Sequence, residues 1–124
     1  MKVLLDTHVV LWWYIDPQTI QSDSRQIIVD PDNEIYISPI VIWEIMVKSG
    51  MKKLSVPDQL LTKVQTDFIE LPLTILHSKA LSAIKKIHND PFDLLLIAQA
   101  KAEGFYLMTR DKEILKYDIK VLKA

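Results

Sequence analysis

The chain has 124 residues, with 15 Lys and Arg against 16 Asp and Glu and a net charge of −1. This length predicts one domain, and the 49% of hydrophobic residues excludes a disordered chain. The small net charge gives no overall attraction to nucleic acid or membrane, so any site for a polyanion must come from local arrangement. Cysteine is missing, which excludes disulfides and thiolate chemistry.

No segment predicts a membrane anchor. The apolar run at residues 9–15 is too short to span a bilayer. Asp6 and His8 interrupt the apolar stretch that a secretory signal would need, and no cleavage site follows. We therefore expect a cytoplasmic protein without a membrane partner.

The first predicted elements alternate between strand and helix. Residues 2–5 form a short apolar run, typical of a parallel strand that is buried on both faces. A helical stretch follows at 9–14, and a second helix is expected at 22–29, with Ser22-Asp23-Ser24 as its capping residues. Residues 35–37 predict the second strand.

The middle of the chain predicts two helices. Ser38-Pro39 begins the first of them, at 40–48, because Ser accepts from free amides and Pro suits the first turn. Residues 51–56 are expected to form a loop, and Pro57-Asp58 to open a helix that continues through residue 68. A minor strand, or none, is expected at 71–73.

The last third predicts further helix–strand alternation. Apolar residues recur at helical spacing over 75–87. Asp90-Pro91 opens a helix that runs to residue 103, followed by a strand at 106–109, one or two helical turns at 111–115 and a strand at 119–122. This alternation predicts the α/β class with a parallel sheet and right-handed crossovers.

Acidic residues stand near the predicted strand ends. In an open parallel sheet, sites form just past the carboxyl ends of the strands. Asp6 directly follows the first strand, and Asp111 follows the strand at 106–109. Glu44 lies in the helix after the second strand, and Asp93 in the first turn of the helix opened at Asp90. Clustered carboxylates repel one another unless a cation is present, and oxygen ligands suit Mg²⁺ or Mn²⁺ rather than zinc.

Each of these acids also has a purely structural interpretation. Asp90 is placed to cap its helix, and Asp93 to reach back in a capping box. Asp111 could cap its short helix, and Glu44 could pair with Lys48 one turn later. The residue types alone leave both interpretations open.

Basic side chains flank the acidic positions: Lys48, Lys52, Lys53, Lys85, Lys86, His88 and Arg110. Cations beside an acidic, metal-filled pocket fit a polyanionic substrate, whose neighbouring phosphates they would hold. The alternative for each lysine is a solvated helix face.

Four motifs in order resemble those of a PIN domain, specifically of the VapC-type toxins of bacterial type II toxin–antitoxin pairs: Leu4-Leu5-Asp6-Thr7-His8 with Trp12-Trp13, Ser38-Pro39 with Trp43-Glu44-Ile45, His88-Asn89-Asp90-Pro91-Phe92-Asp93 with Leu96-Ile97-Ala98-Gln99-Ala100, and Thr109-Arg110-Asp111. The resemblance covers essentially the whole chain. It implies one PIN domain over residues 1–124, with a PIN-like (Rossmann-like) three-layer α/β/α fold and a mostly parallel central sheet.

The resemblance also implies an activity, a cofactor and partners. It implies a Mg²⁺-dependent endoribonuclease, with Mn²⁺ as a substitute, that hydrolyses RNA phosphodiester bonds by metal-activated water. A cognate antitoxin would silence it, and it would act as a homodimer. At Leu94 the chain departs from the subgroup, which often has a basic residue there.

The resemblance assigns roles by position. The catalytic and metal-binding carboxylates are Asp6, Glu44, Asp93 and Asp111, with Asp90 as an additional metal ligand. The expected substrate-binding residues are Lys48, Lys52, His88, Arg110 and Thr109, of which Thr109 could also help to place Asp111 or a metal-bound water.

Two rival functions differ from this one in class. One is a catalytically weak PIN-like module that binds RNA or a protein partner. The other is phosphoryl transfer through an aspartyl phosphate on Asp6. The Asp-x-Asp-x-Thr pattern of that chemistry is missing, since position 8 is His.

Overall fold

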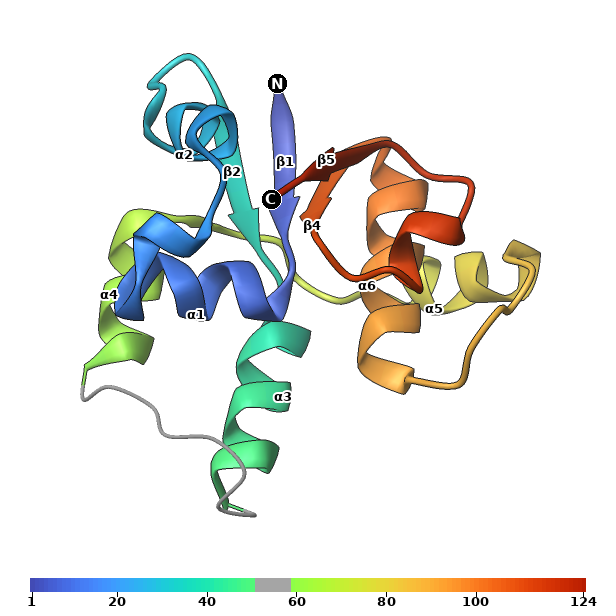
Figure 1. Cartoon of the computed structure of the whole chain (residues 1–124). Coiled ribbons are helices and arrows are strands. Elements are labelled where there is room, and N and C mark those ends of the chain that lie inside the picture. The colour runs from blue at the N-terminus through green and yellow to red at the C-terminus, as the bar shows by residue number, and fades with distance from the viewer. Residues whose placement is uncertain (51–58) are drawn as a thin grey trace.

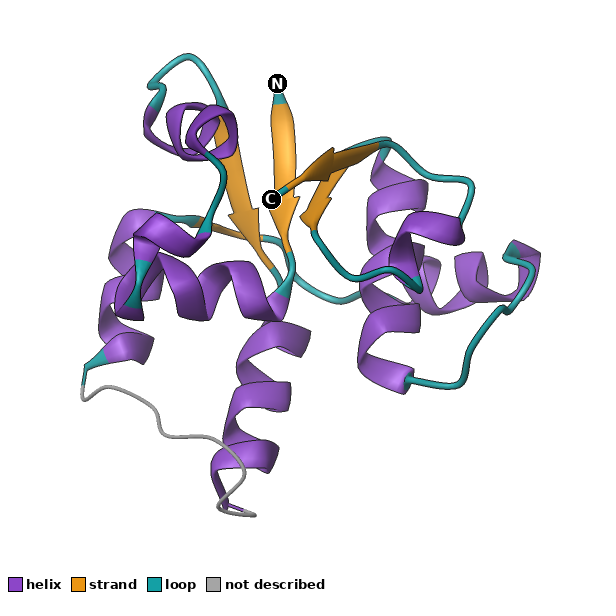
Figure 2. Cartoon of the chain, viewed as in Figure 1, coloured by secondary structure: helices purple, strands orange, loops and turns teal. Residues whose placement is uncertain are grey.

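The computed structural model describes residues 1–50 and 59–124. Its strands form one five-stranded sheet in which every pairing is parallel, with helices on both sides (Figures 1 and 2). In chain order the strands are β1 (Lys2–Leu5), β2 (Glu34–Ile37), β3 (Ile69–Glu70), β4 (Tyr106–Thr109) and β5 (Val121–Lys123). The predicted α/β fold with a parallel central sheet is therefore confirmed.

The strand order is β3-β2-β1-β4-β5. The chain builds outward from β1 in one direction as far as β3 and then returns to the other side of β1 with β4. Right-handed crossovers then place most of the helices between β1 and β3 on one face of the sheet and those between β3 and β4 on the other. Figure 1 shows α1 (Thr7–Ile15), α2 (Ser22–Val29) and α4 (Leu60–Asp67) on one side and α5 (Ile75–Ala80) and α6 (Pro91–Glu103) on the other, while α3 (Pro39–Gly50) contacts both α1 and α6.

The helices have these bounds: α1 Thr7–Ile15, α2 Ser22–Val29, α3 Pro39–Gly50, α4 Leu60–Asp67, α5 Ile75–Ala80 and α6 Pro91–Glu103. Short 3₁₀ helices occupy Pro17–Thr19, Leu81–Ala83 and Ile114–Lys116. In the described parts of the chain, no helix has both the length and the apolar character needed to cross a membrane.

The core lies along the two central strands and the helices packed on them. Val3, Leu4 and Leu5 of β1 and Leu107 and Met108 of β4 are fully buried. Apolar strands that are covered on both faces explain why these segments read as continuous hydrophobic runs rather than alternating ones. This core holds the carboxyl ends of β1 and β4 in a fixed position.

Helix starts agree with the prediction in two places and differ in one. The Ser38 hydroxyl accepts from the Ile40 N–H (3.1 Å), and Asp90 caps α6, as expected. The predicted cap of α2 is wrong, because Gln21 is the N-cap residue and no side chain caps this helix. Ser24 instead donates its hydroxyl to the carbonyl of Lys123 (2.8 Å), which ties α2 to β5.

The predicted helix at 75–87 is also wrong in its second half. α5 ends at Ala80, a 3₁₀ turn follows, and residues 84–90 are not helical. The apolar spacing did not mark a buried face, since Ile75 and Leu76 are 79% and 65% exposed. The N–H groups of Ile87 and His88 bond the Tyr117 hydroxyl, a tertiary contact that replaces the helical bonds.

Other boundaries moved by a few residues. The minor strand predicted at 71–73 lies at Ile69–Glu70, and the last strand is Val121–Lys123 rather than 119–122. α4 begins after Gln59, which has a left-handed backbone (φ 66°). The loop predicted at 51–56 and the helix start at Pro57-Asp58 lie outside the described residues.

Candidate active site

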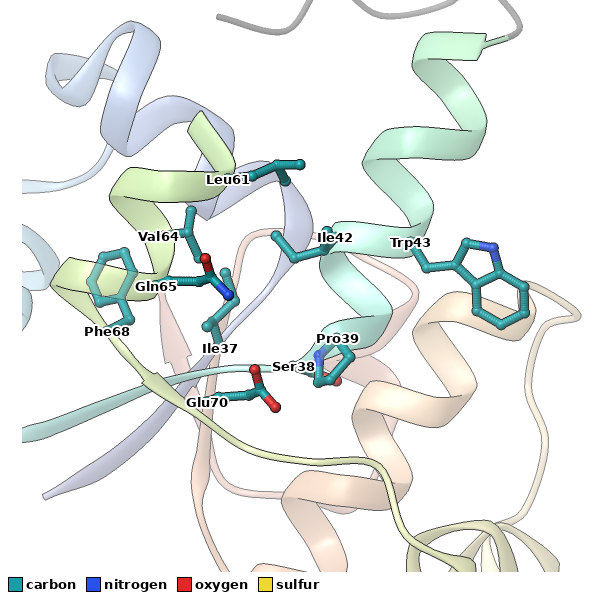
Figure 3. A pocket seen from close by; sticks show the side chains of 10 residues that line it. All are labelled: Ile37, Ser38, Pro39, Ile42, Trp43, Leu61, Val64, Gln65, Phe68 and Glu70. Carbon is teal, nitrogen blue, oxygen red and sulfur yellow. The ribbon is translucent and has the colours of Figure 1, made fainter. Parts of the chain in front are cut away.

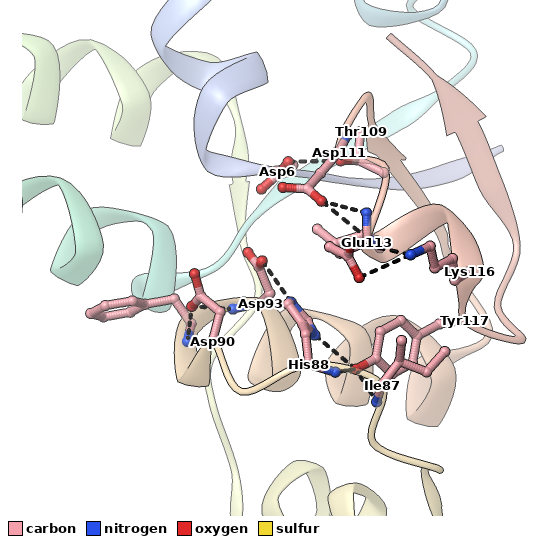
Figure 4. Close-up of polar contacts among 12 residues, drawn as sticks. Asp6, Ile87, His88, Asp90, Asp93, Thr109, Asp111, Glu113, Lys116 and Tyr117 are labelled. Carbon is pink, nitrogen blue, oxygen red and sulfur yellow. Dashed lines mark hydrogen bonds and ion pairs between the residues drawn. The ribbon is translucent and has the colours of Figure 1, made fainter.

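The candidate site lies where the strand order reverses, between β1 and β4. Leu5 pairs with Met108, and the N–H of Asp6 donates to the carbonyl of Met108 (3.0 Å). Asp6 and Thr109 are therefore neighbours just past the last strand pair, and the Thr109 hydroxyl donates to Asp6 Oδ2 (2.7 Å; Figure 4). This is the switch point at which open parallel sheets place their ligands.

Asp6 is held on both oxygens and is almost fully buried, with 3% of its surface exposed. The backbone N–H of Thr7 donates to Oδ1 (2.7 Å) while Thr109 occupies Oδ2. Burial raises the pKa of the Asp6 carboxyl, and the negative charge of Glu44 raises it further, although these two hydrogen bonds oppose the rise. Asp6 is therefore a carboxylate held in place by two hydrogen bonds, and burial disfavours its charged form.

Glu44 reaches the same edge from α3 and is also 3% exposed. The Thr7 hydroxyl donates to its Oε1 (2.6 Å), so Thr7 joins Asp6 to Glu44 through its two polar groups. The Lys48 ammonium bonds Oε2, which raises the pKa of Lys48. The helical pairing of Glu44 with Lys48 that the sequence left open is thus present.

Asp93 enters from the first turn of α6 and is 8% exposed. Its Oδ2 lies 3.0 Å from Nε2 of His88. Burial, together with the negative charges of Asp90, Asp6 and Asp111, raises the pKa of Asp93 to about 7, against the lowering effect of His88. Asp93 therefore lies within the electrostatic field of Asp90, which caps the same helix, and of Asp6 and Asp111 from two other segments of the chain.

Asp90 is the N-cap residue of α6, whereas Asp111 accepts two backbone hydrogen bonds just before the 3₁₀ turn at 114–116, whose N-cap residue is Glu113. Asp111 Oδ1 accepts from the N–H groups of Glu113 (2.8 Å) and Ile114 (3.3 Å). Asp90 Oδ1 accepts from the N–H groups of Phe92 (2.9 Å) and Asp93 (3.3 Å). In both residues these bonds involve Oδ1 alone, so they leave Oδ2 of each carboxylate out of this backbone pairing.

Figure 4 shows Asp6, Asp93 and Asp111 coming together from β1, α6 and the turn after β4. Within residues 1–50 and 59–124, however, no three His, Asp or Glu side chains form a ready-made metal site. The donors are all oxygens, and Mg²⁺ typically binds one or two carboxylates while keeping several waters. The chemistry of the donor set, and the raised pKa values of Asp6 and Asp93, therefore fit Mg²⁺ without a complete protein cage.

A small cavity opens beside these carboxylates. It has a volume of about 200 Å³ and is lined by Asp6, His8, Trp12, Arg110 and Asp111. The Arg110 guanidinium lies 4.3 Å from the centre of the Trp12 ring, donates to the Ala124 carbonyl (2.9 Å) and bonds the Thr19 carbonyl. These contacts fix one cation in the wall of an otherwise acidic cavity.

A larger pocket of about 590 Å³ lies between α3 and α4 (Figure 3). Its lining is mostly apolar and includes none of the predicted site residues: Ile37, Ser38, Pro39, Ile42, Trp43, Leu61, Val64, Gln65, Phe68 and Glu70. Among the described residues that line this pocket, Glu70 is the single carboxylate and there is no cluster of ionisable groups, so its volume alone does not mark it as a site of chemistry.

The residues predicted to bind substrate have different surroundings. The five carboxylates at this end of the sheet form an acidic edge: Asp6, Glu44, Asp90, Asp93 and Asp111. Lys48 and Arg110 lie beside the acidic edge but already form the bonds described above. Thr109 is fully buried between Asp6 and the N–H of Asp111, so it positions carboxylates, the alternative that the sequence allowed. His88 has both ring nitrogens in contact with protein atoms, and Lys52 lies outside the described residues.

Two residues at this edge were missed by sequence reasoning. Thr7 bonds both Asp6 and Glu44, and Tyr117 bonds His88. A signal for Thr7 was available, since a hydroxyl directly follows the acid at a strand end. Tyr117 gives no local signal, because its partner lies 29 residues away.

Comparison with known proteins identifies the family of this chain. The family model described as PIN domain matches residues 3–120. Ribonuclease VapC22 of Mycobacterium tuberculosis is 30% identical over 119 residues, which cover 90% of this chain and 88% of that protein.

Solved structures share the fold. VapBC2 from Rickettsia felis, bound to a promoter DNA fragment, matches with a TM-score of 0.74 and 18% identity, covering 98% of each chain. DNA-bound VapBC from Salmonella typhimurium matches with a TM-score of 0.69 and 18% identity, covering 98% of this chain and 97% of that one. The chain therefore belongs to the PIN domain family, as a domain of the VapC type.

Proposed function

We propose that this protein is an endoribonuclease that hydrolyses RNA phosphodiester bonds with Mg²⁺, or Mn²⁺ in its place. The observation that carries the proposal is the meeting of Asp6, Asp93 and Asp111 at the switch point, where burial, together with the negative charges of Asp90, Asp6 and Asp111, raises the pKa of Asp93 to about 7. A fold retains such an arrangement at a cost in stability, and a bound cation would offset that cost. The ribonuclease activity of the 30% identical relative gives independent support.

The cation would be held by Asp6, Asp93 and Asp111, with Glu44 and Asp90 adding negative charge close by. When bound, Mg²⁺ supplies a Lewis acid that activates water and neutralises charge on the phosphate. Thr7 and Thr109 hold both oxygens of Asp6, so this carboxylate needs no reorganisation to act. Such preorganisation is what makes charged groups effective in catalysis.

The cations at the edge would bind the RNA backbone. Lys48 keeps 37% of its side chain exposed while bonded to Glu44, and Arg110 forms part of the wall of the acidic cavity. A phosphate placed next to the carboxylates would meet both of these positive charges. Neither side chain would read base identity, so we expect the RNA to bind through its phosphates.

The test is RNA cleavage by the purified chain with Mg²⁺, with EDTA, and by the Asp6→Asn variant. We expect cleavage with Mg²⁺ alone, and a loss on the order of 10²–10³-fold in the variant, because several kcal/mol of transition-state stabilisation would be removed. The matched control is Glu70→Gln, which removes a carboxylate from the apolar pocket.

The product ends test the mechanism. Attack by water leaves a 5′-phosphate and a 3′-hydroxyl, whereas attack by the RNA 2′-hydroxyl leaves a 2′,3′-cyclic phosphate. Finding the cyclic product, or finding that Asp6→Asn cleaves at the wild-type rate, would contradict the proposal.

We further propose that a cognate antitoxin silences the enzyme and that the protein acts as a homodimer. Support for the antitoxin comes from the neighbours in structure, which are toxin–antitoxin complexes. Co-expression with the small protein of the adjacent reading frame should relieve the growth arrest caused by the wild type, while Asp6→Asn should cause no arrest. Light scattering on the isolated chain measures the oligomer.

A second candidate is a PIN-like module that binds RNA or a protein partner with little catalysis. It is favoured by the bond between Lys48 and Glu44 and by the lack of a three-ligand cluster in the described part of the chain. RNA binding that is unaffected by EDTA, without cleavage, would select this alternative.

A further inference from the structure

The Tyr117 hydroxyl lies at the start of an ordered chain of hydrogen bonds. Tyr117 is buried, and its oxygen accepts from the backbone N–H groups of Ile87 (2.8 Å) and His88 (3.2 Å). A phenolic oxygen has two lone pairs and one proton. The two backbone donors occupy the lone pairs, so the hydroxyl proton is left for a third partner.

That third partner is Nδ1 of His88, 2.8 Å away. Because Tyr117 can only donate here, Nδ1 must accept, and it is therefore unprotonated. The proton of the neutral imidazole then lies on Nε2. Nε2 donates to Asp93 Oδ2 over 3.0 Å, so every bond from the backbone to Asp93 has one direction (Figure 4).

The chain of bonds joins three separate segments. Tyr117 follows the 3₁₀ turn after β4, His88 lies in the non-helical segment 84–90, and Asp93 lies in the first turn of α6. The side chains of His88 and Asp93 are only 17% and 12% exposed. With both ring nitrogens used, His88 has no free nitrogen for the phosphate contact that the sequence suggested.

We propose that His88 and Tyr117 are positioning residues that fix the carboxylate of Asp93 at the acidic edge. His88 occupies one oxygen of Asp93 and thereby sets the plane of the carboxylate, while Tyr117 fixes the tautomer and orientation of the ring. This inference rests on the proposed function for its catalytic consequence, since Asp93 would hold the cation there. Partners that orient a ligand in this way contribute about 10–100-fold to metal affinity or activity.

The molecule contains a matched control pair. His77 Nε2 lies 2.9 Å from Glu103 Oε1, and its Nδ1 accepts from the N–H of Thr74. The pair joins α5 to α6 with the same chemistry but includes none of the predicted site residues. His77→Gln therefore removes a buried histidine without touching the acidic edge.

The test compares His88→Ala, His88→Gln and Tyr117→Phe with the wild type and His77→Gln. Gln at 88 keeps a donor near the position of Nε2, so it should rescue what Ala loses. NMR on the metal-free proteins measures the proton position on the His88 ring and the χ1 rotamer of Asp93. Calorimetry measures the affinity for Mn²⁺, and RNA cleavage gives kcat and KM.

We expect the wild type to carry the His88 proton on Nε2 and to show one Asp93 rotamer. His88→Ala should average the rotamer and weaken Mn²⁺ affinity and kcat by about 10–100-fold with little change in KM. His88→Gln should restore most of this loss, Tyr117→Phe should mix the two tautomers, and His77→Gln should lower only stability.

The outcomes separate this inference from the proposed function. A wild-type ring protonated on Nδ1, or a single Asp93 rotamer in His88→Ala, overturns the positioning role whatever the activity. A fixed rotamer in the wild type that is lost in His88→Ala, together with no cleavage and no Mn²⁺ binding, would sustain the positioning role and reject the nuclease.

Discussion

Strand β1 and the residue that follows it are both buried, but burial affects them in opposite ways. Leu4 and Leu5 are fully covered, and each such side chain gains about 1.5–3 kcal/mol from leaving water. Asp6, the next residue, is covered almost as well, and there burial raises the carboxyl pKa because it penalises the charge. Burial of the apolar core thus stabilises the fold, whereas burial of the Asp6 charge destabilises it.

α6 shows the same contrast over a single turn. Leu96 and Ile97 are fully buried and pack in the core, while Asp93 begins the same helix under an unfavourable field from neighbouring acids. The apolar residues of α6 hold the helix in the core, and they thereby keep the Asp93 carboxylate at a position that is unfavourable for its charge. Apolar burial therefore stabilises this helix, whereas the buried charge of Asp93 opposes folding at the same end of the sheet.

The largest effect should follow from damaging the core. Leu107 of β4 is fully buried and pairs with Leu4 and Val121. Leu107→Ala should lower the free energy of unfolding by about 2–5 kcal/mol, because it removes apolar contacts and leaves a cavity. Urea unfolding measures this change. A cost within about 0.5 kcal/mol, as at surface positions, would contradict the assigned core.

At the acidic edge, by contrast, a substitution should raise the free energy of unfolding. The pKa of Asp93 is about 7 in the folded protein against an ordinary 3.8, so the folded state binds more protons between these values and stability falls as pH rises through them. Asp93→Asn should therefore stabilise the metal-free protein at pH 8 by roughly 1–3 kcal/mol. The gain should vanish by about pH 4.

Unfolding of both proteins in urea across this pH range, with EDTA present, measures that difference. Glu70→Gln removes an exposed carboxylate and should change stability by no more than about 0.5 kcal/mol. An Asp93→Asn variant that is less stable than the wild type at pH 8 would break the contrast between core and edge.

A bound cation should stabilise the folded protein by reducing the repulsion among the carboxylates of the acidic edge, and it should leave the contribution of the core unchanged. At ten times its dissociation constant, Mg²⁺ should stabilise the wild type by about 1.4 kcal/mol, since it binds the folded state alone. Asp93→Asn should gain less at the same concentration, whereas Leu107→Ala should gain as much as the wild type. Thermal unfolding with Mg²⁺ and with EDTA tests this, and equal gains in wild type and Asp93→Asn would count against the site.

The smallest effect is expected at Lys48, whose bond to Glu44 is partly open to solvent. Lys48→Met should lower stability by roughly 0.2–1 kcal/mol, as partly exposed ion pairs do. It should weaken RNA binding as well, because it removes a cation from the edge. Fluorescence anisotropy with an RNA oligonucleotide measures the affinity for RNA. An unchanged affinity in Lys48→Met would contradict a contact between Lys48 and the RNA.

The sequence allowed much of the edge to be predicted, for reasons that differ by residue. Asp6 was predictable because an acid directly after an apolar strand must lie at the sheet edge. Glu44 was predictable from its place in the helix after the second strand, but the four-residue spacing to Lys48 allowed two interpretations, and the structure shows the pairing.

The rest depends on contacts between distant segments. The bond between His88 and Tyr117 exists only because residues 84–90 leave the helix that apolar spacing predicted. That spacing misled because α5 buries His77 through a capping box and leaves Ile75 and Leu76 outside. Local periodicity records where apolar residues recur, and tertiary hydrogen bonds decide which of them are covered.

The most direct test of the account is the pKa of the Asp93 carboxyl, measured by ¹³C NMR in the metal-free protein and again with saturating Mg²⁺. Without metal the pKa should be about 7, raised by burial and neighbouring acids. With Mg²⁺ the pKa should fall by at least one unit, equivalent to about 1.4 kcal/mol of interaction with the cation. A pKa near 3.8 that does not respond to Mg²⁺ would contradict the claim that the buried acids form a cation-dependent site.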